Sequence, residues 1–486
     1  MLFNSWGYLL FLAVFVGLHW VTSRSLRMAV LAVGSILFYG MWRWEFCFLM
    51  VFSACVDYVA AQKVASSEKE GPRKAWLLTS LVTNLGLLLF FKYTYFVHDN
   101  IRFVASAAGW EMTPLADMGI RIILPLGISF YTFQTISYTI DVYRRVIEPT
   151  RDFLAFLTYV TFWPQLIAGP VLRAGEVLPQ LEQARKPKLE DLTNGCFLIL
   201  IGTLKKVLIA DNIAPFVDGI FAQDVATFTA FDVWVAAFLF GFQIYCDFSG
   251  YSDVAIGSAR ILGIHFPDNF NWPYMAKSPR DFWKRWHISL SAWIRDYLYL
   301  PLTGREFRTR STDGIAVATE SGGSQATRAL FLTWFIMGLW HGAGWTFALW
   351  GVYHAGLVYM YRQVSFLKAL PRRQPAVAWG LMLALGMAGW IPFRAVDIRQ
   401  SVEMFSAIMN PLRYGFSNRA VGGIEYATSA SLVVGMLVAY GYYRASEKGW
   451  ITRGLDWPLK VVFVAFGVFA VLLYLRPVRQ FIYFQF

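Results

Sequence analysis

The chain has 486 residues, of which 57% are hydrophobic and only 15% are charged, and its net charge is +12. Because a soluble domain carries about 25% charged residues, this composition excludes an ordinary soluble protein and predicts an all-α polytopic membrane protein surrounded by lipid. An excess of Lys and Arg is typical of the cytoplasmic loops of such a protein, so we expect no nucleic-acid partner.

The first part of the chain alternates between apolar runs and polar loops. The run at residues 9–21 has neither a basic flank nor a small-residue cleavage site, so we expect a retained helix over about 4–22 rather than a signal peptide. Basic loops lie at residues 23–27, 62–74 and 144–151, whereas the loop at 98–119 has one Arg and three acidic residues. By the positive-inside rule, the basic loops face the cytoplasm and the N-terminus lies outside.

The middle of the chain is less regular. Residues 153–170, 250–263 and 281–299 are apolar or amphipathic but contain Pro, Gly or charges, so we expect broken, re-entrant segments that face the cytoplasm. Further helices are expected at about 329–346, 347–362, 377–394, 427–443 and 457–475. This count places the C-terminus outside as well. Since no Gly-, Ser- or Pro-rich linker interrupts the sequence, we expect one integral-membrane domain over residues 1–486.

The cysteines and the sequence motifs indicate no disulfide, metal or nucleotide site. The cysteines lie in or beside apolar stretches and form no C-x-x-C pair, which predicts buried thiols; they are Cys47, Cys55, Cys196 and Cys246. No H-E-x-x-H motif or Cys/His cluster has metal-ligand spacing. No Walker A, G-x-G-x-x-G or G-x-S-x-G motif opens a helix after a strand. We therefore expect no metal and no bound cofactor.

His341 stands out among the six histidines, in the stretch FIMGLWHGAGWTFALWG. If a helix starts on the inside at Arg328, His341 lies about 20 Å along it, past the midplane of a bilayer core of about 30 Å. Trp340 and Trp345 would wall the site, and the glycines after the histidine would allow close approach. A neutral imidazole in such a site suits a general base for a hydroxyl. The alternative is a buried histidine bonded to a nearby carbonyl.

His287 lies in the stretch DFWKRWHISLSAWIRDYLYLPL. Read as one helix, this stretch has an apolar stripe that contains Trp283, Trp286 and His287. Basic side chains such as Arg285 cover much of the rest and would attract a phosphorylated donor such as acetyl-CoA. The alternative is an interfacial amphipathic helix with an incidental histidine. On a straight helix Asp296, nine residues further on, would face away from His287.

The two histidine stretches together resemble the membrane-bound O-acyltransferase family. Four further blocks resemble its bacterial branch, which contains the alginate O-acetyltransferase membrane subunit; they are LPLGISFYTFQTISYTIDVYR (124–144), FWPQLIAGPVLR (162–173), KKVLIAD (205–211) and YCDFSGYSDVAIG (245–257). The resemblance implies a ring of transmembrane helices around a central tunnel. It also implies that the family's two signature histidines are His341, the catalytic residue, and His287.

The resemblance further implies a reaction. The donor would be a cytoplasmic acyl thioester, with acetyl-CoA as the first candidate, and the acceptor an extracytoplasmic polysaccharide such as alginate or cellulose. A periplasmic acetyltransferase would be the partner, and the location would be the bacterial inner membrane. We expect substrate contacts from Trp283, Arg285, Trp286, Asp296, Trp340 and Gln165. A transporter or flippase without acyl chemistry, or a non-catalytic scaffold, remains open.

The chain ends on FIYFQF, residues 481–486, of which four are aromatic and none is charged. One interpretation is an aromatic tail packed at the membrane interface, where aromatic side chains gather. The other is that Tyr483, as a third catalytic residue, accepts the acyl group on its phenol oxygen and passes it on. The related teichoic-acid and alginate systems look to have tails of this kind.

Overall fold

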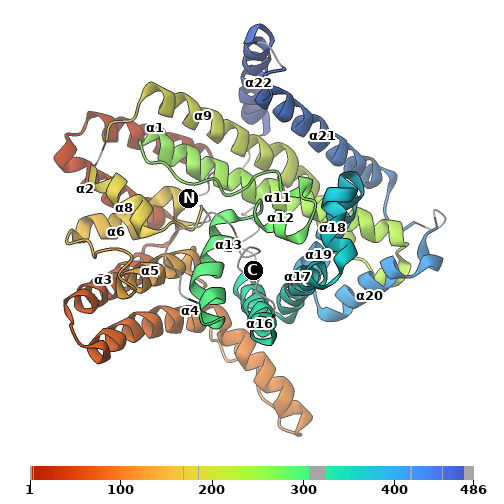
Figure 1. The fold of residues 1–486 in the computed structure, drawn as a ribbon, viewed down its shortest axis with the longest axis horizontal. Coiled ribbons are helices and arrows are strands. Elements are labelled where there is room, and N and C mark those ends of the chain that lie inside the picture. The colour runs from red at the N-terminus through yellow and green to blue at the C-terminus, as the bar shows by residue number, and fades with distance from the viewer. Residues whose placement is uncertain are drawn as a thin grey trace. The chain divides into compact units, whose positions relative to one another are not determined.

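The computed structural model describes residues 3, 5–167, 169–183, 185–305, 323–415, 419–450 and 453–474 (Figure 1). Its regular elements in these ranges are all helices, as the composition predicts. Six of them are long and apolar enough to cross a membrane. These are α3 (Glu45–Ser66), α4 (Glu70–Ala107), α11 (Ala230–Ile261), α19 (Pro375–Arg394), α21 (Gly423–Glu447) and, from Leu26 on, α2 (Arg24–Arg43).

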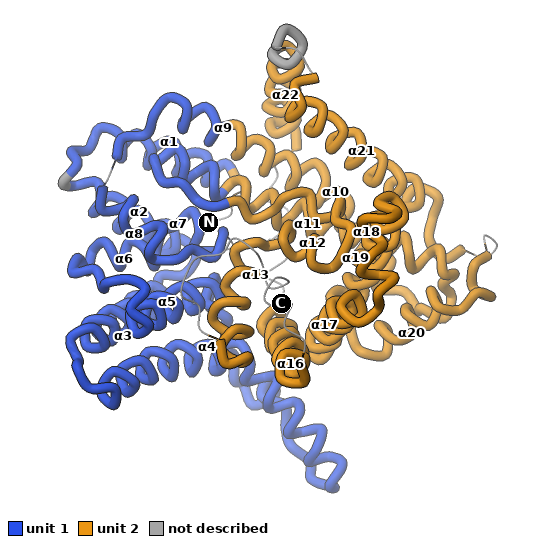
Figure 2. The backbone as a smooth tube through the Cα atoms, viewed as in Figure 1, with its two compact units in different colours: residues 1–2, 6–196, 255–267 blue, residues 3–5, 197–254, 268–486 orange. Residues whose placement is uncertain are grey.

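The chain divides into two compact units that interleave in sequence (Figure 2). Unit 1 comprises residues 1–2, 6–196 and 255–267, and unit 2 comprises residues 3–5, 197–254 and 268–486. Two helices, α9 (Leu189–Leu204) and α11, contribute residues to both units. The expectation of a single domain stays a prediction.

Unit 1 is a bundle in which α3 packs against both α4 and α5. It also contains α1 (Trp6–Val21), α5 (Ile128–Tyr143), α6 (Phe153–Thr161), α7 (Trp163–Leu166) and α8 (Ala174–Gln183). Asp57 of α3 is fully buried, and it accepts hydrogen bonds from Ser80 and from the Asn84 amide, both on α4. Buried polar groups need such partners, so this cluster fixes how α3 and α4 pair.

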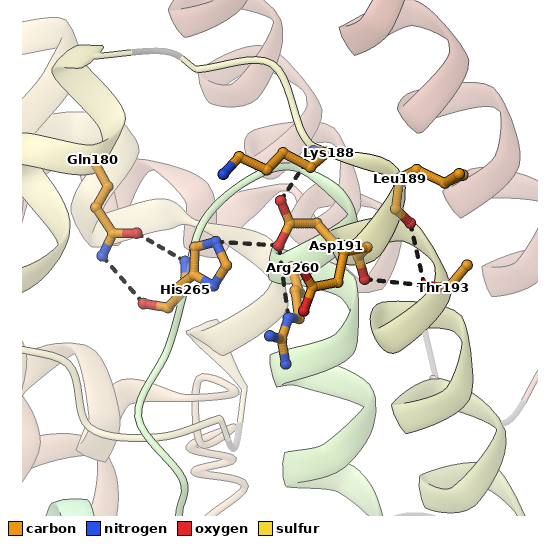
Figure 3. A network of polar contacts seen from close by, with 8 residues as sticks. Gln180, Lys188, Leu189, Asp191, Thr193, Arg260 and His265 are labelled. Atoms are coloured by element: carbon orange, nitrogen blue, oxygen red, sulfur yellow. Dashed lines mark hydrogen bonds and ion pairs between the residues drawn. The ribbon is translucent and has the colours of Figure 1, made fainter. Parts of the chain in front are cut away.

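A second polar network in unit 1 holds the segment that follows α11 (Figure 3). The Asp191 carboxylate accepts the backbone N–H of Lys188 at 3.0 Å and faces His265 Nε2 at 3.4 Å and Arg260 Nε at 3.8 Å. The Gln180 side chain brackets the backbone of His265, accepting its N–H at 2.8 Å and donating to its carbonyl at 3.1 Å. The network therefore anchors the loop after α11 to α8 and to the start of α9.

Unit 2 contains a helical hairpin, α16 (Ser324–His341) and α17 (Trp345–Gln363). Its other short elements before the hairpin are η1 (Lys205–Ala210), α10 (Asp211–Phe221), η2 (Val225–Thr227), η3 (Pro273–Met275), α12 (Pro279–Trp283), α13 (Ile288–Ile294), η4 (Arg295–Tyr299) and α14 (Leu300–Leu302). After it come α18 (Ser365–Arg373), α20 (Ile398–Met409), η5 (Pro411–Arg413) and α22 (Arg453–Tyr474). The segments η1 and η4 are π-helical, a geometry frequent at functional sites.

Two glycines let α16 and α17 touch along their backbones. A Cβ on Gly351 would overlap the carbonyl of Trp334, and a Cβ on Gly338 would overlap that of Phe347. Small residues at a crossing allow membrane helices to pack this closely. The hairpin is thus fixed by backbone contact, which sets where the side chains at its tip lie.

Three segment predictions were wrong. Residues 250–263 are not broken, since most of them continue α11, whose Gly250 packs against the backbone of Gly202 in α9. The segment 281–299 is broken, as expected, but the reading of the stretch around His287 as one helix is wrong, because His287 takes a left-handed conformation (φ 42°, ψ 56°) between α12 and α13. The loop expected at 98–119 starts later, since α4 runs on to Ala107.

Two further details differ from the expectations. The helix expected to run to residue 346 ends at His341, where Gly342 turns to an extended conformation. The four cysteines are free thiols, but only Cys246 is buried, while Cys55 and Cys196 are exposed on the protein surface. Exposed apolar surface on a membrane helix faces lipid, so an apolar sequence run does not distinguish protein burial from lipid contact.

Candidate functional site

His341 is the last residue of α16 and is 4% exposed. Its Nδ1 lies 2.7 Å from the carbonyl oxygen of Met337, one turn earlier in the helix. A carbonyl can only accept a hydrogen bond, so Nδ1 carries the proton. The lone pair of the neutral ring therefore sits on Nε2, which is the nitrogen able to take a proton from a substrate.

Aromatic rings surround His341. The centroid of its ring lies 4.8 Å from that of Trp350 on α17, 5.0 Å from Trp340 and 5.6 Å from Phe393 on α19. Trp345, which the sequence placed beside the site, is 52% exposed. The walls of the site therefore come from three helices of unit 2, and they are apolar enough to strengthen electrostatic interactions inside it.

His287 is fully buried at the junction of α12 and α13. Its Nδ1 lies 3.2 Å from Oδ1 of Asn269, and its ring meets that of Phe248 at 4.6 Å. It lies outside the six candidate spans. Burial lowers the pKa of His287 well below its usual value, and charge on His341 lowers it further. His287 is therefore neutral at neutral pH, and the two imidazoles influence each other electrostatically.

A continuous aromatic path joins the two histidines within unit 2. Starting at His287, successive ring centroids are 6.4 Å apart to Phe270, 5.1 Å to Trp286, 4.7 Å to Trp390, 6.3 Å to Trp350 and 4.8 Å to His341. Trp286, predicted to contact substrate, is thus part of the wall between the two histidines. Packed aromatic rings of this kind hold their neighbours in fixed orientations.

A third histidine, His354, joins this cluster. It lies on α17 and is 2% exposed, and its ring packs 4.9 Å from Trp350, 5.0 Å from Trp283 and 5.6 Å from Trp334. The spacing of 13 residues from His341 does not align the two on one straight helix. The chain turns back between them at the hairpin tip, so both histidines reach Trp350 from different helices.

The other predicted contact residues of unit 2 are placed as follows. Trp283 and Trp340 are buried in the aromatic cluster. Arg285 forms an ion pair with Asp281 at 2.7 Å, which offsets part of the charge expected to attract a phosphorylated donor. Asp296 is fully buried in η4, and its Oδ2 accepts from Nη2 of Arg295 at 2.9 Å. Asp296 therefore anchors its neighbour.

Gln165 and Tyr483 are the remaining predicted site residues. Gln165 belongs to unit 1, where its amide donates to the carbonyl of Tyr159 at 2.8 Å. Tyr483 lies outside the described residues, so its predicted role stays a prediction.

Sequence reasoning missed Asn269, Trp350 and His354. Asn269 sits in a polar turn, and nothing in the turn's composition marks the contact that it makes 18 residues further on. Trp350 reaches His341, and His354 reaches Trp350, because α16 ends at His341 and the chain turns back into α17. Within the described ranges, no group of three His, Cys, Asp or Glu side chains is placed to hold a metal ion. The chemistry that these residues support is proton transfer in a dry aromatic site.

Comparison with known proteins identifies the family. Residues 147–390 match the model of the membrane-bound O-acyltransferase family, MBOAT. The "Probable alginate O-acetylase AlgI" of Pseudomonas putida is 37% identical over 88% of this chain and 85% of that protein. The "Peptidoglycan O-acetyltransferase" of Helicobacter pylori is 34% identical over 78% of this chain and 73% of that protein. The "Teichoic acid D-alanyltransferase" of Bacillus subtilis is 28% identical over 54% of this chain and 64% of that protein. The chain belongs to the membrane-bound O-acyltransferase family.

Proposed function

We propose that this protein transfers an acetyl group from a cytoplasmic thioester to a hydroxyl acceptor, for O-acetylation of a polysaccharide outside the membrane, and that His341 is the general base. The observation that carries the proposal is the fixed tautomer of His341. Met337 holds the proton on Nδ1, so Nε2 presents a basic lone pair inside an aromatic wall. A base of this kind accelerates attack by a hydroxyl.

The relatives support the acceptor class. Their names specify alginate, peptidoglycan and teichoic acid as acceptors of acyl groups. We infer an exopolysaccharide as the final acceptor of the acetyl group, and the relatives named for alginate cover 88–90% of this chain.

The reaction proceeds by addition and elimination. Nε2 of His341 takes the proton of the acceptor hydroxyl while the oxygen of that hydroxyl bonds to the thioester carbonyl carbon. The tetrahedral intermediate then collapses, the C–S bond breaks, and the imidazolium returns the proton to the thiolate. The products are an acetyl ester and a free thiol, and no external oxidant, reductant or metal is required for balance.

The intermediate carries an oxyanion that needs hydrogen-bond donors. The indole N–H groups of Trp283, Trp334 and Trp350 are buried and make no hydrogen bond within the described residues. An unmet buried donor costs about 1–3 kcal/mol, a cost that substrate binding would offset. Trp350, whose ring lies 4.8 Å from that of His341, is the donor that we assign to the oxyanion.

A polymer is too large for a buried site, so the acceptor at His341 is a relay group. We propose that Tyr483 accepts the acetyl group on its phenol oxygen and that a periplasmic acetyltransferase then moves it to the polysaccharide. This route requires the segment that carries Tyr483 to lie on the extracytoplasmic side, as the distribution of basic loops predicts. Covalent relay divides one difficult transfer into two easier ones.

The experiment uses purified full-length protein in lipid vesicles with radiolabelled acetyl-CoA. We expect label on the wild-type protein or on an added acceptor, and a loss of at least about 100-fold in His341→Ala. His98→Ala, a histidine in unit 1, serves as the matched control and should transfer normally. Transport of unreacted donor into the vesicles with no label transferred would instead indicate a transporter.

A further inference from the structure

We propose that Asn269 is a positioning residue for the proposed transfer: it fixes His287 as the Nδ1–H tautomer and presents Nε2 of His287 toward the reaction. This inference rests on the proposed function for its kinetic part. The contact between Asn269 and His287 lies within unit 2.

The amide of Asn269 has only one orientation that satisfies its neighbours. Oδ1 accepts the backbone N–H of Ser289 at 3.3 Å and the hydroxyl of Ser289 at 2.8 Å. On the other side, Nδ2 donates to the hydroxyl oxygen of Ser252 at 3.1 Å. A backbone N–H can only donate, so the atom facing Ser289 must be the carbonyl oxygen.

The ring of His287 then has one tautomer. Its Nδ1 lies 3.2 Å from the same Oδ1, which has no proton to give, so Nδ1 must carry the hydrogen. Since burial and His341 lower the pKa of His287, the ring is neutral and its other nitrogen, Nε2, holds the lone pair. In both His287 and His341 the basic nitrogen is therefore Nε2. Nδ1 donates its proton to Asn269 in His287 and to the Met337 carbonyl in His341.

Asn269 also shapes the backbone that carries His287. Its own carbonyl accepts the N–H of Ile288 at 3.0 Å, and its side chain accepts that of Ser289. These are the first two N–H groups of α13, which have no partner inside the helix. The two bonds start α13 immediately after His287, which stays in a left-handed conformation that costs about 1–3 kcal/mol for a residue other than glycine.

Two aromatic rings and His341 also act on His287. Among the described residues, the rings of Phe248 and Phe270 lie 4.6 Å and 6.4 Å from the imidazole, and neither ring titrates. The charge that acts on it is that of His341. A neutral His287 therefore lets His341 accept a proton without like-charge repulsion. A carboxylate in place of the amide would reverse this, because it would stabilise a protonated His287.

The test compares Asn269→Asp with Asn212→Asp, an equivalent change in α10 whose amide donates to the carbonyl of Val207. Protein labelled with ¹⁵N-histidine is titrated by NMR in detergent micelles, with the His287 signal assigned by its loss in His287→Gln. We expect wild-type His287 to show the Nδ1–H tautomer and to stay neutral at pH 7. In Asn269→Asp we expect a raised pKa of His287, a kcat at least about tenfold lower, and an acid limb of the pH profile moved to higher pH, with KM little changed.

Asn269→Ala is the second variant, because it removes Oδ1, the acceptor that faces Nδ1 of His287. It should give a mixture of His287 tautomers even if Asn269→Asp fails to fold. An unchanged tautomer and pKa of His287 in both variants would overturn the proposal. The NMR readout needs no turnover, so an active His341→Ala protein would refute the proposed function and leave this inference standing or falling on its own signals.

Discussion

At the scale of single residues, the site depends on which nitrogen carries a proton. Met337 fixes His341 and Asn269 fixes His287, both at Nδ1. The sequence could predict that two histidines matter, because they lie in stretches that resemble a known family. It could not predict their tautomers, since one acceptor is a backbone carbonyl, which every residue has, and the other is an amide from a different segment.

Replacing Trp350 by Phe tests the oxyanion donor. The substitution keeps an aromatic ring against His341 but removes the indole N–H. Loss of one such donor costs about 100-fold in kcat, and we expect a decrease of that order with little change in KM.

The control is Trp345→Phe, which removes an indole N–H from the same helix at an exposed position. It should transfer acetyl at the wild-type rate. Equal kcat values for the Trp350 variant and the wild type would show that Trp350 is only part of the wall. Thermal unfolding of both proteins separates loss of the donor from loss of the fold.

At the scale of elements, the hairpin of α16 and α17 positions the chemistry. Its glycines bring the two backbones together, and the tip then places Trp350 beside His341, with His354 on the same helix against Trp350. The sequence predicted two consecutive helices here and placed their boundary about five residues late, at 346–347. That shift decides which tryptophan faces the histidine, because Trp345 begins α17 and Trp350 lies more than a turn inside it.

Replacing Gly351 by Val tests this contact. The new side chain would overlap the carbonyl of Trp334 and force the helices apart, and overpacking of this kind costs about 1–3 kcal/mol. We expect a lower melting temperature in detergent and a loss of transfer, since Trp350 moves with α17.

Gly356→Val is the matched control, because Gly356 lies on the same helix with open space around its Cα. It makes the same change in helix propensity without the clash. If both variants melted at the same temperature and transferred equally, close packing at Gly351 would not be what positions the site.

At the scale of the whole molecule, the sequence predicted the class of protein and some of its long helices. Apolar runs of about 20 residues are required to cross a bilayer, and the helices expected at about 377–394 and 427–443 correspond to α19 and α21. The breaks and continuations of the middle segments were harder to predict from the sequence. The turn at His287 depends on Asn269, and the continuity of α11 depends on the packing of Gly250 against α9. Both are tertiary contacts that override local pattern.

The most direct test of the central claim is acetylation of the cell-surface polysaccharide in cells whose only copy of this protein carries His341→Ala. Acetyl esters are measured on the isolated glycan, and the amount of folded protein in the membrane is measured in parallel. We predict that ester content falls to the level of cells lacking the protein while the membrane amount stays normal. Acetyl esters at more than about a tenth of the wild-type content, with normal protein levels, would contradict the assignment of His341 as the general base.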